Sequence, residues 1–142
     1  MAKYIAGYFG LSLVKLDFGN LGGGLVGESE KNMDNALNLI EAISPCVLWV
    51  DEMEKAFSGS KGNSGHETTK RLIGKFLTWM QEKGEKGVSC FVFATANDIS
   101  QMPPEMFRSG RFDDKFFTFM PTSEECAKIF ASIINGQCNK YR

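Results

Sequence analysis

Short apolar runs alternate along this chain with longer segments in which apolar residues recur every three or four positions. Residues 11–18, 46–50 and 88–95 are runs rich in the residue types that favour β-strands, and residues 115–119 form a further strand candidate. The run at 46–50 is apolar at every position. This is typical of a strand that is covered on both faces, as in a parallel sheet.

Two long segments have the periodicity of amphipathic helices. Residues 28–44 carry acidic residues in the first turn, where the helix dipole favours them, and Pro45 ends the segment. Residues 67–83 form the second predicted helix, with apolar residues along one face. It follows a stretch rich in glycine and serine that predicts a loop at 58–65.

Two further helices are expected in the last third of the chain. A short helix is predicted at 102–107, where prolines stand at the start. The last helix is predicted to begin at a capping box formed by Thr122 and Glu125 and to end at Gly136. Strands that alternate with helices indicate βαβ units. The expected fold is therefore α/β, a three-layer sandwich around a mostly parallel sheet.

Length and composition fit one globular domain. The chain has 142 residues, of which 43% are hydrophobic and 23% are charged, and its formal net charge is −1. A net charge so close to zero argues against a generally basic nucleic-acid-binding protein. No apolar run approaches the roughly 18 residues of a membrane-spanning helix, and residues 1–7 do not have the pattern of a signal peptide.

The cysteines and the histidine do not form a recognisable metal site. The 4 cysteines are at positions 46, 90, 126 and 138, none of them in a C-x-x-C pair, and His66 is the only histidine. This spacing argues against a zinc centre. Cys46 and Cys90 lie in apolar runs and are predicted to be small core residues, which suits a reducing compartment.

Polar side chains follow the second and third predicted strands. Asp51 and Glu52 come directly after residues 46–50, and Asn97 comes shortly after residues 88–95. Ligands of open parallel sheets bind beyond the carboxyl ends of the strands, so we expect these side chains at one edge. There an Asp can hold Mg²⁺, a Glu can polarise an attacking water and an Asn can orient that water, as nucleoside-triphosphate hydrolysis requires. The alternative is that Asp51 and Glu52 merely cap a turn.

These residues lie in stretches that resemble motifs of the AAA+ ATPases. VLWVDE at 47–52 resembles the Walker B motif, and TAND at 95–98 resembles sensor 1. FRSGRFD at 107–113 resembles the end of the second region of homology, and GLVGESE at 24–30 resembles the stretch that carries the first pore loop. The motifs occur in the family's order. Within the family, the chain resembles the stand-alone AAA proteins of cyanobacteria and algal plastids.

The resemblance implies a role for each matching residue. Asp51 would bind the nucleotide's Mg²⁺ through water, Glu52 would be the catalytic base, and Asn97 would be the sensor residue beside the nucleotide. Arg108 and Arg111 would be arginine fingers that reach the nucleotide of a neighbouring subunit and stabilise charge on the transferred phosphate. Taken on spacing alone, the two arginines could instead form surface salt bridges with the acidic residues at 113 and 114.

Partners and location are also implied by the resemblance. Leu25 and Val26 stand at the pore-loop position, where threading members of the family usually have an aromatic residue. Remodelling of a protein partner is therefore a better expectation than threading of a polypeptide. The parent protein is expected to use ATP and Mg²⁺ as a hexameric homo-oligomer in the cytoplasm or plastid stroma, without a membrane or nucleic acid.

One family motif has no counterpart in this sequence. The phosphate loop G-x-x-x-x-G-K-[ST] is absent, and the only Gly-Lys pair, Gly74-Lys75, lies within a predicted helix. Residues 1–7 resemble the back half of the helix that follows this loop. We therefore expect residues 1–121 to be a partial core and 122–142 the start of the helical lid. The first central strand and most of the lid would be missing, and the chain alone would bind Mg²⁺ and ATP poorly and be inactive.

A missing central strand would leave strand edges unpaired, which is unfavourable. In the family that strand lies between the strands that residues 88–95 and 115–119 resemble. We therefore expect these two segments either to pair directly or to be bridged by a second copy of the chain in a strand-exchanged dimer.

Two other classes of function remain open at this point. Gly22, Gly24 and Gly27 match the dinucleotide fingerprint G-x-G-x-x-G, and Asp51 follows 24 residues later, which fits an NAD-binding oxidoreductase. This alternative leaves Glu52, Asn97 and the arginine pair without a role. The second alternative is a non-catalytic interaction module derived from an AAA domain.

Overall fold

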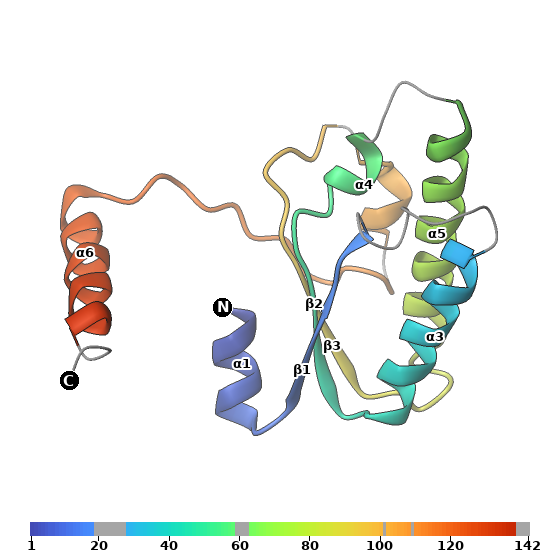
Figure 1. Cartoon of the computed structure of the whole chain (residues 1–142), viewed down its shortest axis with the longest axis horizontal. Helices are drawn as coiled ribbons and strands as arrows, with labels where there is room; N and C mark the ends of the chain where they lie inside the picture. Colours follow the sequence, from blue (N-terminus) through green and yellow to red (C-terminus); the bar gives the residue numbers. More distant parts are fainter. Residues whose placement is uncertain (19–27, 59–62, 101, 109, 139–142) are drawn as a thin grey trace.

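The computed structural model describes residues 1–18, 28–58, 63–100, 102–108 and 110–138. Strands and helices alternate along these residues, as the apolar pattern predicts (Figure 1). In chain order the elements are α1 (Ala2–Phe9), β1 (Ser12–Leu16), α3 (Glu28–Ala42), β2 (Cys46–Val50), α4 (Lys55–Ser58), α5 (Asn63–Glu82), β3 (Cys90–Ala94), the 3₁₀ helix η1 (Pro104–Phe107) and α6 (Ser123–Cys138).

The strands form one parallel sheet in the order β1-β2-β3. Ser12 lies opposite Cys46, and Cys46 lies opposite Cys90, so the three strands are in step along their whole length. β2 is the central strand. This position explains why its sequence is apolar throughout, because both of its faces and both of its edges are covered. The predicted α/β class and parallel sheet are confirmed.

Side chains of β2 alternate between two apolar layers. Leu48 and Val50 pack into the core beneath α3 and α5, whereas Val47 packs against Ala2 and Ala6 of α1 on the opposite face. Helices therefore cover both faces of the sheet (Figure 1). This is the predicted three-layer arrangement. Successive side chains of β2 reach opposite layers because side chains alternate between the two faces of a strand.

The larger core lies on the α3–α5 side of the sheet. Phe76 of α5 is fully buried, and its ring packs edge-on against Phe18 and stacks on Trp79. Met33 and Ile40 of α3 are also fully buried. Burial of one such side chain contributes about 1.5–3 kcal/mol, so these helices hold the sheet rigid beneath its carboxyl edge.

Two helices extend beyond their predicted bounds. α5 begins at Asn63, inside the predicted loop at 58–65, because Asn and Ser favour helix starts as well as loops. α6 continues to Cys138, past the predicted end at Gly136. A single glycine costs a helix only about 1 kcal/mol relative to alanine and does not by itself end it.

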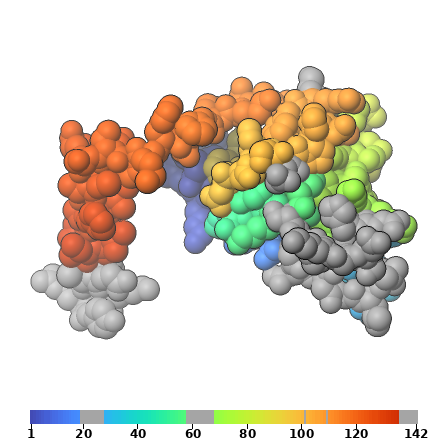
Figure 2. All heavy atoms as spheres, turned by 90° about the horizontal axis from the view of Figure 1, so that it is seen from above, coloured from blue at the N-terminus to red at the C-terminus, as the bar shows by residue number. Residues whose placement is uncertain are grey.

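The capping box at the start of α6 is confirmed. The Thr122 hydroxyl accepts a hydrogen bond from the Glu125 amide at 3.3 Å, and the Glu125 carboxylate accepts one from the Thr122 amide at 2.8 Å. The apolar face predicted for this helix is present but largely exposed, with Phe130 at 63% and Ile134 at 60%. α6 stands apart from the α/β body at the end of an extended segment (Figures 1 and 2).

The strand predicted at 115–119 is not formed. The prediction that this segment pairs directly with β3 is therefore wrong. The segment has no regular secondary structure, and Phe116 and Phe119 are 88% and 84% exposed. Aromatic residues favour strands only where a neighbouring strand edge is within reach. Within the described residues, β3 has β2 as its only strand neighbour. A second copy of the chain bridging the two segments stays a prediction.

Candidate functional site

Acidic residues leave β2 beside the end of β3. Val50 lies opposite Ala94 in the sheet, so Asp51 and Thr95 follow the two strands at the same level. The ladder continues past both strands, because the Thr95 amide donates to the Val50 carbonyl and the Met53 amide donates to the Thr95 carbonyl, each at 2.9 Å. These bonds fix the backbone of both loops relative to each other.

The Thr95 hydroxyl joins the two acidic residues. It donates a hydrogen bond to Asp51 Oδ1 at 2.7 Å and accepts one from the Glu52 amide at 3.0 Å. Glu52 has a left-handed backbone with φ of 50°. A non-glycine residue in this region is strained, and strain of this kind persists only where the surroundings impose it. The Thr95 hydroxyl and the Met53 amide bond together hold this conformation.

Two lysines pair with the acidic residues. Lys15 Nζ, from β1, lies 3.1 Å from Asp51 Oδ2, and Lys55 Nζ, from α4, lies 2.5 Å from Glu52 Oε2. The hydrogen bond from Thr95, followed by that from Lys15, lowers the pKa of Asp51. The hydrogen bond to Glu52 raises the pKa of Lys55. The charged forms of Asp51 and Lys55 are therefore favoured at this edge of the sheet.

Asn97 lies at the same edge but faces another carboxylate. Its Nδ2 donates to Glu54 Oε1 at 3.0 Å, and Glu54 is buried with only 8% of its surface exposed. The amide is therefore fixed from the loop that carries Asp51 and Glu52. Asn97 thus follows β3 on the edge where Asp51 and Glu52 follow β2, and its amide contacts Glu54.

Arg108 and Arg111 follow the 3₁₀ helix η1. Arg111 donates from Nη1 to the Glu105 carbonyl, and Arg108 is exposed. Among the residues that the structure describes, neither arginine forms an ion pair with Asp113 or Asp114. The surface salt bridges that spacing alone allows are not formed, and the Arg108 guanidinium is left accessible from outside.

A small cavity of about 120 Å³ opens beside the acidic pair. It is lined by Lys15, Asp17, Phe18, Asp51, Glu52, Lys55 and Ala56. The described part of the chain holds no group of three or more His, Cys, Asp or Glu side chains suited to a metal ion. Asp51 could still hold Mg²⁺ through a coordinated water, because Mg²⁺ usually keeps several waters and takes its other ligands from nucleotide phosphates. The residues of this cavity therefore fit a Mg²⁺ ion whose ligands are mainly water and phosphate oxygens.

Sequence reasoning gave no role to Thr95, Glu54 or Lys15. Thr95 stands within the TAND stretch, and a hydroxyl at the end of an apolar strand is a signal that could have been used. Glu54 and Lys15 carry no such signal, since only the sheet register and the turn after β2 bring them to this edge. The pore-loop residues Leu25 and Val26, and the glycines at 22, 24 and 27, lie outside the described residues.

The family model described as ATPase family associated with various cellular activities (AAA) matches residues 1–119. The chain belongs to the AAA family. It is 49% identical over 129 residues to "Uncharacterized AAA domain-containing protein ycf46" of Guillardia theta and 50% identical over 131 residues to the protein of that name from Pyropia yezoensis. It is also 24% identical over 138 residues to "Peroxisomal ATPase PEX1" of Saccharomyces cerevisiae.

The AAA chain corresponds to only part of each relative. The alignments with the Guillardia theta and Pyropia yezoensis proteins cover 91% of this chain but 25% and 26% of the relatives. That with the Saccharomyces cerevisiae protein covers 96% of this chain and 13% of the relative. The chain thus spans about a quarter of the length of the first two relatives.

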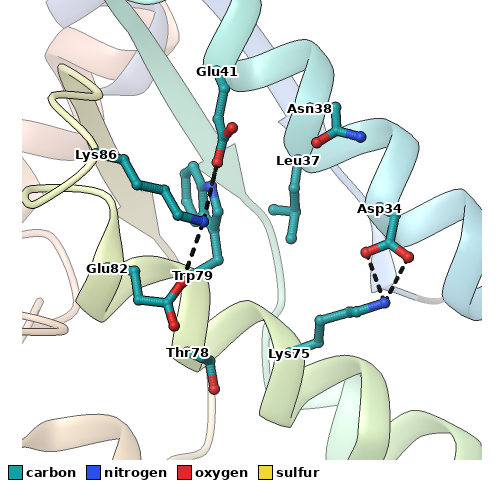
Figure 3. Close-up of a pocket in the computed structure, with 9 residues that line it drawn as sticks. All are labelled: Asp34, Leu37, Asn38, Glu41, Lys75, Thr78, Trp79, Glu82 and Lys86. Atoms are coloured by element: carbon teal, nitrogen blue, oxygen red, sulfur yellow. Dashed lines mark hydrogen bonds and ion pairs between the residues drawn. The ribbon is translucent and has the colours of Figure 1, made fainter.

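The AAA chain also has a groove of about 330 Å³ between α3 and α5 (Figure 3). Its charged side chains pair with one another: Lys75 lies 2.6 Å from Asp34, and Lys86 lies 3.2 Å from Glu82. The Trp79 indole donates to Glu41 at 2.9 Å on the groove wall. This mutual pairing explains the groove as the ionic rim of the helix–helix contact, separate from the acidic edge of the sheet. Nowhere in the described part of the chain is a helix long and apolar enough to cross a bilayer.

Proposed function

We propose that this chain is the part of an AAA ATPase that carries the water-activating half of the nucleotide site. The observation that carries the proposal is the joint placement of Asp51 and Glu52 against Thr95 at the carboxyl edge of a parallel sheet. Family membership supports it, since members of the family are ATPases by the description of the family itself. The parent protein would hydrolyse ATP.

Asp51 and Glu52 divide the chemistry in this proposal. Asp51 would hold Mg²⁺ through water, and the positive charge of the ion would offset the negative charge of the phosphate oxygens. Glu52 would accept the proton of the attacking water. Because Lys55 lies 2.5 Å from Glu52 Oε2, the base must leave this ion pair, or use its other oxygen, when water is in place. The strained backbone of Glu52 fixes where that carboxylate can reach.

Asn97 and the arginines would act on the nucleotide from different subunits. The Asn97 amide is held by Glu54 on the same edge as Glu52, a position from which it could orient the attacking water. Arg108 is exposed and, within the described residues, forms no ion pair, so it could reach a nucleotide in a neighbouring copy. Arg111 would support the same contact. Removal of a finger of this kind costs about 10³–10⁵ in rate in related enzymes.

The remaining family-based expectations belong to the parent protein. We propose that it assembles as a hexameric ring, remodels a protein partner through the loop that carries Leu25 and Val26, and works in the cytoplasm or plastid stroma. Because the sequence lacks G-x-x-x-x-G-K-[ST], we propose that the isolated chain turns over little ATP. The family match favours this scheme over an NAD-binding oxidoreductase.

A chimera tests the proposed function. This chain would replace the matching quarter of the Guillardia theta relative, and ATP hydrolysis would be measured with Mg²⁺ for the unchanged relative, the chimera and the chimera with Glu52→Gln. We expect the chimera to hydrolyse ATP and the Glu52→Gln form to bind ATP without hydrolysing it. A folded chimera that is inactive beside an active relative, or one that Glu52→Gln leaves unaffected, would contradict the proposal. An inactive chimera would support the alternative that the chain is a non-catalytic interaction module.

A further inference from the structure

Lys15 brings a positive charge to the oxygen of Asp51 that faces away from Thr95. Its Nζ lies 3.1 Å from Asp51 Oδ2, while the Thr95 hydroxyl occupies Oδ1 at 2.7 Å. Both carboxylate oxygens of Asp51 therefore already have a hydrogen-bond donor. Any divalent cation that binds this carboxylate must share it with, or displace, the lysine ammonium.

The same ammonium also lies over an aromatic ring. Lys15 Nζ is 4.6 Å from the centre of the Trp49 ring, because Lys15 and Trp49 are opposite each other in the register of β1 and β2. Cation–π attraction gives the ammonium a second favourable partner next to the carboxylate. Lys15 can thus move away from Asp51 without losing all of its stabilising contacts.

We propose that Lys15 is a positioning residue that occupies the Asp51 carboxylate when no metal is bound and yields it to a divalent cation. The proposal rests on the proposed function, which makes Asp51 the residue that holds Mg²⁺. Lys15 holds the Asp51 carboxylate by its Oδ2 atom at the cavity beside Glu52, and it lowers the affinity of the site for bare divalent cations. The site therefore favours a cation that arrives with the extra negative charge of a polyphosphate.

The expected change in divalent-cation affinity follows from how exposed the Lys15–Asp51 ion pair is. The side chains of Lys15 and Asp51 are 50% and 32% exposed, so solvent screens their attraction substantially. Pairs of this kind are worth about 0.2–1 kcal/mol, and 1 kcal/mol corresponds to about fivefold in affinity. Removal of the Lys15 charge should therefore tighten divalent-cation binding by up to about fivefold.

The test is an NMR titration of the 142-residue chain with Mn²⁺ and, separately, with Mg²⁺. Mn²⁺ broadens amide signals near its site, and Mg²⁺ moves them without broadening. The variants are Lys15→Met, which keeps an apolar stem over Trp49, and Lys15→Arg, which keeps the charge. Lys75→Met is the matched control, because Lys75 forms a comparable ion pair with Asp34 at 2.6 Å. Asp51→Asn shows whether the metal is on Asp51, and thermal unfolding of each variant checks that it is folded.

We expect broadening centred on Asp51 and Glu52, reached at up to about fivefold lower Mn²⁺ in Lys15→Met and at the wild-type concentration in Lys15→Arg and Lys75→Met. Mg²⁺ should move the Trp49 indole signal in the wild type but not in Lys15→Met. Equal Mn²⁺ dependence in Lys15→Met and wild type would overturn the role of Lys15 and leave the metal assignment of Asp51 intact. Persistence of the broadening in Asp51→Asn would overturn both. Absence of broadening around Asp51 in every variant would overturn the role of Lys15 alone, because the isolated chain is expected to bind Mg²⁺ poorly.

Discussion

The hydroxyl of Thr95 lies 2.7 Å from Asp51 Oδ1, so a neutral side chain from one strand end fixes a carboxylate from the next. The same hydroxyl accepts the Glu52 amide at 3.0 Å. A hydroxyl has one proton to donate and lone pairs to accept, and here both functions serve consecutive acidic residues. The geometry of the acidic pair therefore depends on a residue outside the pair.

Replacement of Thr95 by valine should disturb both acidic residues. The Glu52 amide would lose its acceptor, which lowers the free energy of unfolding by about 1–2 kcal/mol. The pKa of Asp51 would rise towards its ordinary value, because the Thr95 hydrogen bond is the largest cause that lowers it. Urea denaturation and a carbon-13 NMR titration of the Asp51 carboxyl measure these effects. Thr95→Ser, which keeps the hydroxyl, should show neither, and a similar loss in both variants would contradict this account.

The left-handed backbone of Glu52 predicts an unusual order of stability among its variants. Its φ of 50° suits glycine, whereas a residue with a Cβ is strained there. Glu52→Gly should therefore unfold with a free energy about 1 kcal/mol higher than Glu52→Ala, although both lack the ion pair with Lys55. Urea denaturation of the two variants gives the difference directly. Equal stability, or a more stable alanine variant, would show that the backbone at this position is not strained.

Acid should loosen the start of α6 through Glu125. Hydrogen bonds from the Thr122 amide and hydroxyl lower the pKa of Glu125 below its ordinary value. The ionised cap is then favoured in the folded form, so its contribution is complete above the ordinary pKa and is lost as pH falls through the lowered one. Carbon-13 shifts of the first turn of α6 should lose their helical values over that range. In Glu125→Gln this acid transition should be absent, and its survival there would assign it to another group.

Reaction with iodoacetamide should separate the cysteines by burial. Burial first, and then the adjacent Cys46 thiol, raises the pKa of Cys90 to about 12. The thiolate is the nucleophile, so Cys90 should not react at mildly alkaline pH, and Cys46 is 1% exposed. Of the three cysteines whose burial is described, Cys126, which is half-buried on α6, should react first. Peptide mass spectrometry gives the order, and denaturant should release the two strand cysteines together. Early labelling of Cys90 in the folded chain would contradict the buried sheet.

Removal of residues 122–142 should leave the α/β body almost unchanged. The apolar side chains of α6 are exposed, with Phe130 at 63% and Ile133 at 55%, and the larger core contains no residue of this helix. The free energy of unfolding of residues 1–121 should therefore match that of the whole chain within about 0.5 kcal/mol. Urea denaturation followed by Trp fluorescence measures it. A large loss of stability would show that the proposed division at residue 121 cuts through a single unit.

Sequence periodicity was sufficient for the elements whose own residues supply the reason for their form. The apolar run at Cys46–Val50 predicts a central strand. The three-residue spacing of Thr122 and Glu125 predicts the reciprocal hydrogen bonds of the capping box. The strand predicted at 115–119 fails for the opposite reason. Its aromatic residues favour a strand, but formation requires an edge with which to pair, and that edge is a property of the whole fold.

The same division holds at the candidate site. The positions of Asp51, Glu52 and Asn97 at one edge were predictable from the sequence, because parallel strands end on the same side of a sheet. Tertiary structure alone decided that Thr95 ties the two acids together, that Lys15 reaches Asp51 from the far strand, and that Glu54 holds Asn97. Strand order and the turn after β2 set these contacts. The contacts join residues that are far apart in the chain, and no local pattern of residue types encodes such contacts.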